Sequence, residues 1–210
     1  MIQPAAVIFD YGKVLSISQQ PSDMEAMARV AGIDVPVMHD LYWKYRLAFD
    51  RRDLSIEDYW KTIAREGGAV LRNGTMEEII RLDNESWSRP NPVVVTWAGE
   101  IRRSGIRTAI LSNMPITLRR YLTENALWLR DFEYATWSCD VNAVKPEPAI
   151  YWHTLNALKL QPGDTLFLDD KEENVAGARE VGMHAILFEN PAQAWSELRG
   201  RFALPPLAAG

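Results

Sequence analysis

The spacing of apolar and polar positions divides the chain into three segments. The first is a short apolar run, Ala5 to Phe9, which is followed by Asp10 and Gly12 and is typical of a buried strand that opens into a turn. From about Leu15 to Pro92 the apolar residues recur at helical spacing, so we expect a helical unit there. From Val93 onward, strand and helix patterns alternate.

The third segment predicts a mainly parallel sheet. Short apolar runs that alternate with helical patterns favour strands joined by crossover helices, so we expect an α/β fold with helices on both faces of the sheet. With the first run included, the expected strands are Ala5–Phe9, Arg107–Leu111, Tyr134–Ser138, Thr165–Leu168 and His184–Phe188. The last residues, Leu204–Gly210, include two prolines and predict a loose tail.

Three positions in the helical segment carry a signal for a helix start. A Ser or Thr followed three residues later by an acidic residue matches or approaches the capping box, in which each side chain binds the backbone N–H of the other residue. The pairs are Ser22 with Glu25, Thr75 with Glu78 and, in a weaker form, Ser55 with Asp58. We therefore expect helices to begin at these residues.

Composition and charge narrow the class of function. The 210 residues are 47% hydrophobic and 24% charged, which is enough for a globular core in one domain, or in one domain with a sizeable insertion. Lys and Arg number 23 against 28 Asp and Glu, and the net charge is −5. This balance disfavours a nucleic-acid binder with a broad basic face and favours small-molecule chemistry.

Cysteine usage and the pattern of apolar runs indicate the compartment. The single cysteine, Cys139, cannot form an intrachain disulfide, and we expect it to be a small apolar filler. No run approaches the roughly 18 apolar residues of a membrane span, and no charged signal region precedes the first strand. We expect a cytoplasmic protein with no membrane partner. The sequence carries no information on its oligomeric state.

Polar side chains follow three of the expected strands. They are Asp10 with Tyr11 and Gly12, Ser112 with Asn113, and Asp169 with Asp170. Ligands of open α/β sheets bind beyond the carboxyl ends of the strands, and the turn-rich stretch that ends in Lys145 could bring a cation to the same edge. Taken singly, each residue has a structural explanation as a turn former, a helix cap or a solvated lysine. Taken together, they indicate phosphate chemistry.

The physical logic of such a site is charge balance. Crowded carboxylates repel one another, and Mg²⁺ relieves that repulsion while it binds a phosphate oxygen. Lys145 and Ser112 would neutralise and orient the other phosphoryl oxygens. Asp10 would then be free to attack phosphorus, which divides hydrolysis into the formation and the breakdown of an aspartyl phosphate.

Four segments resemble, in order and spacing, the motifs of the haloacid dehalogenase-like (HAD) hydrolase superfamily. They are VIFDYGKVL (Val7–Leu15), AILSN (Ala109–Asn113), VKPEPAIY (Val144–Tyr151) and TLFLDDKEENVAGAREVGM (Thr165–Met183). The resemblance covers nearly the whole chain and implies a Rossmann-like α/β core with a helical cap inserted after the first motif. On that basis we expect the core over residues 1–15 and 91–210 and the cap over residues 16–90.

The resemblance also implies a metal site. Asp10 would be both the nucleophile and a ligand of Mg²⁺, and the main-chain carbonyl of Gly12 would be a further ligand. Asp169 would be the second carboxylate on the metal. Asp170 and Asn174 would occupy supporting positions on the metal side.

The same resemblance implies which residues bind the substrate, a small phosphorylated metabolite. Ser112, Asn113 and Lys145 would hold the phosphoryl group, with Ser112 and Lys145 counted among the catalytic residues beside Asp10. Tyr11 and Gly12 would also contact the substrate.

Gly12 departs from the common phosphatase pattern. That pattern has a second Asp at this position, which acts as general acid and base and is worth roughly 10² to 10⁴ in rate. A phosphatase is the favoured interpretation, and two alternatives stay open. One is a 2-haloacid dehalogenase, which shares the nucleophile, Ser-Asn and Lys but needs no metal. The other is a non-catalytic phosphate-binding protein that lost turnover together with the acid.

The Asp-x-Gly form and the cap stretch FDRRDLSIEDYW (Phe49–Trp60) are similar to a sugar-phosphate phosphatase branch of the superfamily, which implies a phosphosugar substrate. Arg52 stands where that branch usually has a glycine. The cap residues that could select the leaving group are Trp43, Tyr45, Arg46, Arg51, Arg52 and Trp60. Their alternative is structural, because aromatic residues at helical spacing are usually core and helix arginines are usually solvated.

Overall fold

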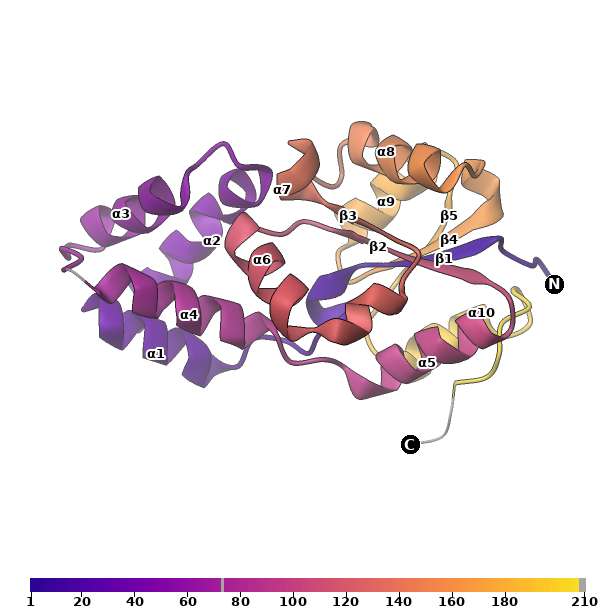
Figure 1. The fold of residues 1–210 in the computed structure, drawn as a ribbon, viewed down its shortest axis with the longest axis horizontal. Helices are drawn as coiled ribbons and strands as arrows, with labels where there is room; N and C mark the ends of the chain where they lie inside the picture. Colours follow the sequence, from indigo (N-terminus) through magenta and orange to yellow (C-terminus); the bar gives the residue numbers. More distant parts are fainter. Residues whose placement is uncertain (73, 208–210) are drawn as a thin grey trace.

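A five-stranded parallel sheet with the order β3-β2-β1-β4-β5 lies at the centre of the structure, a computed structural model that describes residues 1–72 and 74–207 (Figure 1). All four strand pairings are parallel. The strands are β1 (Ala6–Phe9), β2 (Arg107–Ser112), β3 (Tyr134–Trp137), β4 (Thr165–Asp169) and β5 (His184–Leu187). The predicted α/β fold with a parallel Rossmann-like sheet is confirmed.

The register of the sheet brings the ends of β1 and β4 to one level. Phe9 is aligned with Ile110 on β2 and with Leu168 on β4. The backbone N–H of Asp10 donates to the carbonyl of Leu168 at 2.9 Å. Asp10 and Asp169 therefore leave neighbouring strands side by side at the carboxyl edge, where ligands of such sheets bind.

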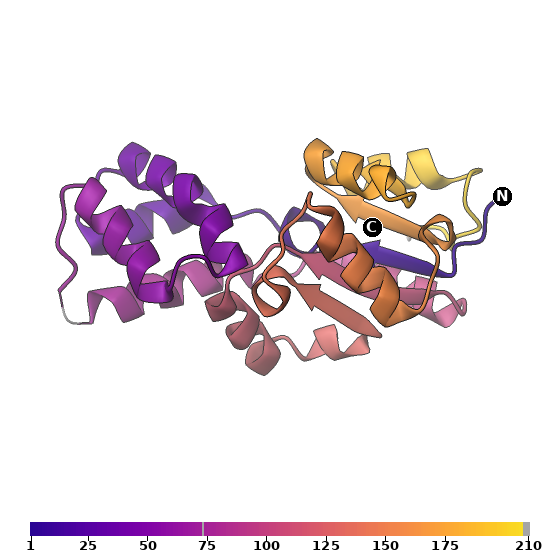
Figure 2. The same cartoon turned by 90° about the horizontal axis from the view of Figure 1, so that it is seen from above.

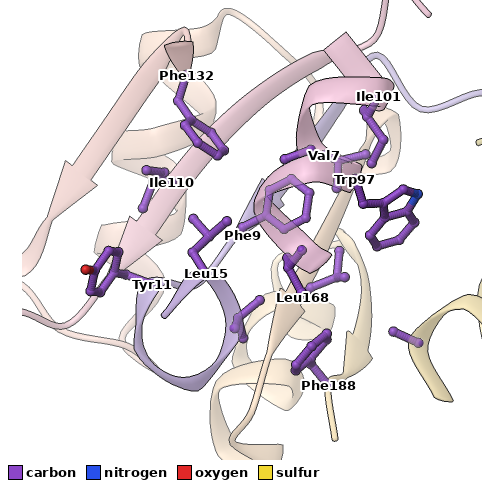
Figure 3. Close-up of a cluster of buried hydrophobic side chains, with 14 of the residues drawn as sticks. Val7, Phe9, Tyr11, Leu15, Trp97, Ile101, Ile110, Phe132, Leu168 and Phe188 are labelled. Atoms are coloured by element: carbon purple, nitrogen blue, oxygen red, sulfur yellow. The ribbon is translucent and has the colours of Figure 1, made fainter. Parts of the chain in front are cut away.

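Helices cover both faces of the sheet because alternate strand residues point to opposite sides. On one face, Phe9, Ile110 and Leu168 pack against α5 (Pro92–Arg103), α6 (Ile116–Asn125) and α10 (Pro191–Leu198) (Figure 3). On the other face, Ile8, Ala109 and Phe167 pack against α8 (Pro148–Leu158) and α9 (Glu172–Glu180). The short helix α7 (Ser138–Val141) follows β3.

Helices α1 to α4 form a unit with its own core. They are α1 (Pro21–Ala31), α2 (Val35–Arg51), α3 (Ile56–Glu66) and α4 (Thr75–Trp87). The unit, called the cap below, stands apart at one end of the molecule in both views (Figures 1 and 2), and its buried residues include Met27, Tyr42, Phe49 and Trp60. Within residues 1–72 and 74–207, no helix has the length and apolar character needed to span a membrane.

Two of the three predicted capping pairs are wrong, although a helix begins at or within one residue of each predicted position. Helix α1 begins at Pro21, and its capping box joins Gln20 with Asp23 rather than Ser22 with Glu25. Proline is favoured at the first helical position because its φ is already helical, and here it sets the start. Helix α4 begins at Thr75 itself, after Gly74, which has a φ of 82°. The third start is confirmed, since Ser55 accepts a hydrogen bond from the N–H of Asp58 at 3.0 Å.

The end of the chain is better anchored than its two prolines indicate. The indole N–H of Trp97 donates to the carbonyl of Pro205 at 3.0 Å, and Leu204 and Leu207 pack against the core. The prediction of a loose tail is therefore wrong for residues 204–207, and residues 208–210 lie outside the described part of the chain. Cys139 is buried, as expected of a small apolar filler.

Candidate active site

Asp10 is held at the end of β1 by two donors on one carboxylate oxygen. The backbone N–H of Tyr11 donates to Oδ1 at 2.7 Å, and Nζ of Lys145 lies 2.8 Å from the same atom. Asp10 is buried, with 6% of its surface exposed. Burial is the main reason why its pKa rises from 3.8 to about 7. Lys145 lowers that pKa, and the nearby Asp169 and Asp170 raise it.

Lys145 is a buried cation between two carboxylates. Its Nζ atom lies 2.6 Å from Oδ2 of Asp169 in addition to its contact with Asp10, and the residue is 2% exposed. Burial alone would lower the pKa of this ammonium, but attraction to Asp10 and Asp169 outweighs burial and raises it. The lysine is therefore charged at neutral pH, and it partly balances the acidic cluster.

The carboxylate of Asp169 accepts hydrogen bonds from three donors. Besides Lys145, it accepts from the N–H of Lys171 and from Nδ2 of Asn174, both at 2.9 Å. The other amide atom of Asn174, Oδ1, is buried and has no hydrogen-bond partner among the described residues. That orphaned acceptor lies beside the acidic cluster and lines the same hollow.

Three carboxylates form a group that is suited to a metal ion. Asp10, Asp169 and Asp170 each offer an oxygen, and these atoms lie within 4.8 Å of one another. Asp170 also pairs with Nζ of Lys13 at 3.1 Å. Oxygen donors of this kind are the ligands that Mg²⁺ prefers. The structure thus brings together the three acidic residues predicted from separate strand ends.

The loop that carries Lys145 is fixed by two neighbouring elements. Asn113, just after β2, accepts from the N–H of Lys145 at 2.8 Å and donates to its carbonyl at 3.0 Å. On the other side, a Cβ at Gly177 of α9 would lie 2.8 Å from the carbonyl oxygen of Pro146. The lysine is therefore aimed at Asp10 by a reciprocal amide contact and by a helix that can approach only through glycine.

The remaining predicted site residues lie around this cluster. Ser112 ends β2, is buried and lines the same hollow as Asp10 and Lys145. The hydroxyl of Tyr11 donates to the carbonyl of Trp87 at 2.9 Å, so its polar group is engaged with the end of α4. Gly12 lies in the turn Tyr11–Leu15, and a Cβ there would meet a ring carbon of Trp87 at 3.6 Å.

A hollow of about 290 Å³ opens above the cluster, between the sheet edge and the cap. Its floor includes Asp10, Ser112 and Lys145. Such a volume is at the lower end of the roughly 300–1,000 Å³ typical of small-molecule sites. The acidic cluster and the ammonium of Lys145 thus face one hollow.

Comparison with known proteins identifies the family. A model of the haloacid dehalogenase-like hydrolases matches residues 4–182. The chain belongs to this family. Bifunctional epoxide hydrolase 2 of Mus musculus is 30% identical over 149 residues, which are 68% of this chain and 26% of that protein. Phosphatase MT3486 of Mycobacterium tuberculosis is 26% identical over 195 residues, which are 90% of this chain and 89% of that protein.

A solved structure shows the same fold. A wild-type HAD family enzyme from Bacteroides thetaiotaomicron, in complex with magnesium and inorganic phosphate, has a TM-score of 0.69 at 18% identity and covers 93% of this chain and 100% of its own. The chain spans about a quarter or less of the length of several curated relatives, which are longer proteins. The resemblance inferred from the four motifs is confirmed at the level of the superfamily.

The cap of this HAD-like hydrolase places only two of its six candidate residues, Trp43 and Arg46, at the hollow. Arg46 is buried, and its guanidinium contacts Asp50 at 2.8 Å and Asp83 at 3.5 Å. The other four candidates are engaged elsewhere: Tyr45 with Glu66, Arg51 with Glu147, Arg52 with the carbonyl of Cys139, and Trp60 within the cap core.

Sequence reasoning assigned no role to several residues that line the hollow. Lys13 belongs to the first motif and pairs with Asp170. Its position, as a charged residue in the turn after the first strand, was the signal that could have indicated a role in the site. Leu47 and Trp87 come from α2 and α4. Their helical spacing gave no signal, because it is the same for residues that face the cap core and for residues that face the sheet.

Proposed function

We propose that this HAD-like hydrolase is a Mg²⁺-dependent phosphatase that hydrolyses a small phosphorylated metabolite through an aspartyl phosphate on Asp10. The observation that carries the proposal is the pairing of Asp10 with Lys145 beside Asp169 and Asp170, on the floor of the hollow. The name of the Mycobacterium tuberculosis relative, which aligns with most of this chain, agrees with a phosphatase.

The residues present fit a magnesium ion. Among the described residues, three carboxylates are crowded with two paired ammonium groups, from Lys145 and Lys13, so the cluster retains negative charge. Repulsion from Asp169 and Asp170 contributes to the raised pKa of Asp10. We assign Asp10, Asp169, Asp170 and the Gly12 carbonyl to the metal, with Asn174 in support. When bound, the ion would polarise the phosphoryl group and offset the charge of the cluster.

Asp10 is the nucleophile in this proposal. Both of its contacts, Tyr11 and Lys145, fall on Oδ1 among the residues that the structure describes, which leaves Oδ2 for attack on phosphorus. A bond forms between Oδ2 and phosphorus while the phosphorus–oxygen bond to the leaving group breaks. A water molecule then attacks the phosphorus of the aspartyl phosphate, and inorganic phosphate leaves with the regeneration of the carboxylate.

Lys145 and Ser112 are assigned to the phosphoryl oxygens. The ammonium of Lys145 stabilises the negative charge of the transferring group, and it stays charged because its pKa is raised. Asn113 holds the backbone of Lys145, so its contribution to phosphate binding includes the placement of that cation. Tyr11 and Gly12 border the same space.

Gly12 gives the leaving group no proton donor. An alkoxide released from phosphorus must then take its proton from water, which slows the release of poor leaving groups. The same feature supports the non-catalytic alternative, a phosphate-binding protein without turnover. The two proposals differ in whether phosphate is released.

The test is phosphate release from hexose phosphates, an alkyl phosphate and an aryl phosphate, each with Mg²⁺ and with EDTA. The matched control is Asp10→Asn, which preserves the shape of the side chain. Mg²⁺-dependent release that is lost in Asp10→Asn supports the proposal, and release from hexose phosphates alone would identify the phosphosugar implied by the resemblance.

Two further outcomes separate the alternatives. Mg²⁺-dependent binding of phosphate without release from any ester would favour the non-catalytic protein. Release of halide from a 2-haloacid, undiminished by EDTA, would favour the dehalogenase and contradict the proposed phosphatase.

A further inference from the structure

Several of the side chains that line the hollow above Asp10 are large and apolar. Trp43 and Leu47 from α2 and Trp87 from α4 form the cap side, and Met114 and Leu118 form part of the opposite side. Trp43 and Leu47 are 38% and 48% exposed. Large apolar side chains that remain exposed at the mouth of a site are typical of ligand grooves.

The polar cap residues at this hollow are bound to each other. Arg46 and Asp50 are joined at 2.8 Å, and both are buried. The guanidinium also contacts Asp83 and the hydroxyl of Tyr42. Among the described residues, the cap therefore contributes no hydroxyl or amide side chain to this lining. A sugar would therefore find few uncommitted hydrogen-bond partners on the cap side, at a cost for each hydroxyl group without one.

A second hollow adjoins the N-terminal half of α2, and its lining mixes apolar residues with polar ones, among them Gln20, Glu25, His39 and Asp40. Val35, Trp43 and Leu47 lie on one face of α2 because their spacing of eight and four residues is helical. A hollow of about 490 Å³ is lined by Val35, Pro36 and Met24, and it shares Lys13, Trp43 and Trp87 with the first. The rings of Trp43 and Trp87 meet edge to face at 6.2 Å where the two hollows adjoin.

We propose that the leaving group is an extended apolar alcohol whose first carbons occupy the hollow above Asp10 and whose distal carbons follow α2 past Trp43 to Val35. This inference rests on the proposed phosphatase, and it departs from the phosphosugar that the sequence resemblance implies. The substrate class is the monophosphate of a long-chain aliphatic alcohol. Lys13, at the junction of the two hollows, lies near the phosphate end and keeps the anion oriented toward the sheet edge.

The first experiment compares ethyl, butyl and octyl phosphate with glucose 1-phosphate, all with Mg²⁺ and below the micelle concentration. Burial of each additional methylene should raise kcat/KM about three- to fourfold until the chain leaves the hollows. A kcat/KM that is flat from ethyl to octyl, or highest for glucose 1-phosphate, would overturn the inference while leaving the phosphatase intact. Absence of release from every ester would count against the phosphatase itself.

A matched pair of variants tests the path along α2. Val35 and Val37 are 38% and 40% exposed and lie two residues apart, but only Val35 lines the second hollow. Val35→Asp should lower kcat/KM for octyl phosphate about tenfold and lower that for ethyl phosphate much less. Val37→Asp should leave both values unchanged. Equal effects of the two variants would contradict the proposed path.

A binding measurement keeps the inference testable without turnover. Calorimetry on the Asp10→Asn protein with Mg²⁺ should show affinity that rises from ethyl to octyl phosphate, with a heat-capacity change that becomes more negative as apolar surface is buried. Leu47→Asn should remove most of that gain, whereas the same change at Leu127, which is exposed on the sheet-bearing part of the molecule, should not. Affinity independent of chain length would overturn the inference.

Discussion

The ammonium of Lys145 lies 2.8 Å from the carboxylate of Asp10 and 2.6 Å from that of Asp169, so one buried cation bridges the ends of two neighbouring strands. Lys145 therefore contributes both to the stability of the free protein and to the proposed reaction. In the free protein the lysine offsets the repulsion between the acidic groups, and in the proposed reaction it faces the phosphoryl group that Asp10 attacks.

Replacement of Lys145 by methionine should affect both properties. Lys145→Met leaves Asp10 and Asp169 buried without their cation, which we expect to cost about 3–5 kcal/mol in the free energy of unfolding without metal. We also expect kcat/KM to fall by about two orders of magnitude or more. Lys61→Met is the control because Lys61 is exposed and its pair with Glu57 is worth little. Urea denaturation and phosphate release measure both effects, and similar values for the two variants would disprove the assigned role.

The buried carboxyl of Asp10 should make the metal-free protein less stable as the pH rises. Its folded pKa of about 7 lies above its ordinary value of 3.8, so the folded state binds more protons between these values. Stability therefore falls as pH rises through this window. Asp10→Asn cannot titrate, and in EDTA its stability relative to the native protein should improve by roughly 2–4 kcal/mol from pH 5 to pH 8.

Asp131→Asn provides the control for that pH dependence, because Asp131 is an exposed carboxylate at a distance from the cluster. Its stability difference from the native protein should be the same at pH 5 and pH 8. Urea denaturation at both pH values measures the stability difference between Asp10→Asn and the native protein. A difference that stays constant or shrinks from pH 5 to pH 8 would show that folding does not raise the pKa of Asp10.

An acid restored at Gly12 should speed the release of poor leaving groups. Gly12 has a φ of −63°, and an added Cβ would stand 3.6 Å from the Trp87 ring, so a side chain fits there. Gly12→Asp should raise kcat for an alkyl phosphate about tenfold or more and change that for an aryl phosphate much less, because the aryl leaving group needs little protonation. Gly12→Asn is the control. If both variants behaved alike, the missing acid would not limit the rate.

The sequence predicted the sheet well because each strand is a buried apolar run that needs only its own pattern to be found. It did not predict the strand order, which depends on contacts between distant segments. Local capping signals at Ser22 and Thr75 failed because Pro21 and Gly74 set those helix starts instead. The anchored chain end was missed because its partner, Trp97, is about a hundred residues away.

The sequence predicted which residues form the site better than it predicted their contacts. Asp10, Asp169, Asp170 and Lys145 meet at one edge, as their places after strands required. The cap was harder, because a helical side chain can face the cap core, the solvent or the sheet with the same spacing. Arg46 faces the hollow yet is bound to Asp50 and Asp83; the spacing of four residues signals the first contact, but the second joins α2 to α4 and has no local signal.

The close contact between α9 and the lysine loop should make Gly177 sensitive to a single methyl group. Gly177→Ala would place a Cβ 2.8 Å from the carbonyl oxygen of Pro146, and relief of that clash must move the loop or the helix. We expect a loss of about 1–3 kcal/mol in stability and a lower kcat/KM. Gly163→Ala is the control, since a Cβ there meets no described atom within 4 Å. Thermal denaturation that ranked the two variants equally would contradict this contact.

Arg52 occupies a left-handed position at the end of α2, with a φ of 74°. A side chain is disfavoured in this conformation and glycine is not, so Arg52→Gly should stabilise the protein by about 0.5–1 kcal/mol despite the loss of the contact with the Cys139 carbonyl. Arg51→Gly, one residue earlier at a helical position, should instead destabilise it by about 1 kcal/mol. Opposite shifts in Tm are expected for these adjacent substitutions, with the loss of the Arg51 pair with Glu147 adding to the second, whereas destabilisation by Arg52→Gly would contradict the role of the backbone conformation.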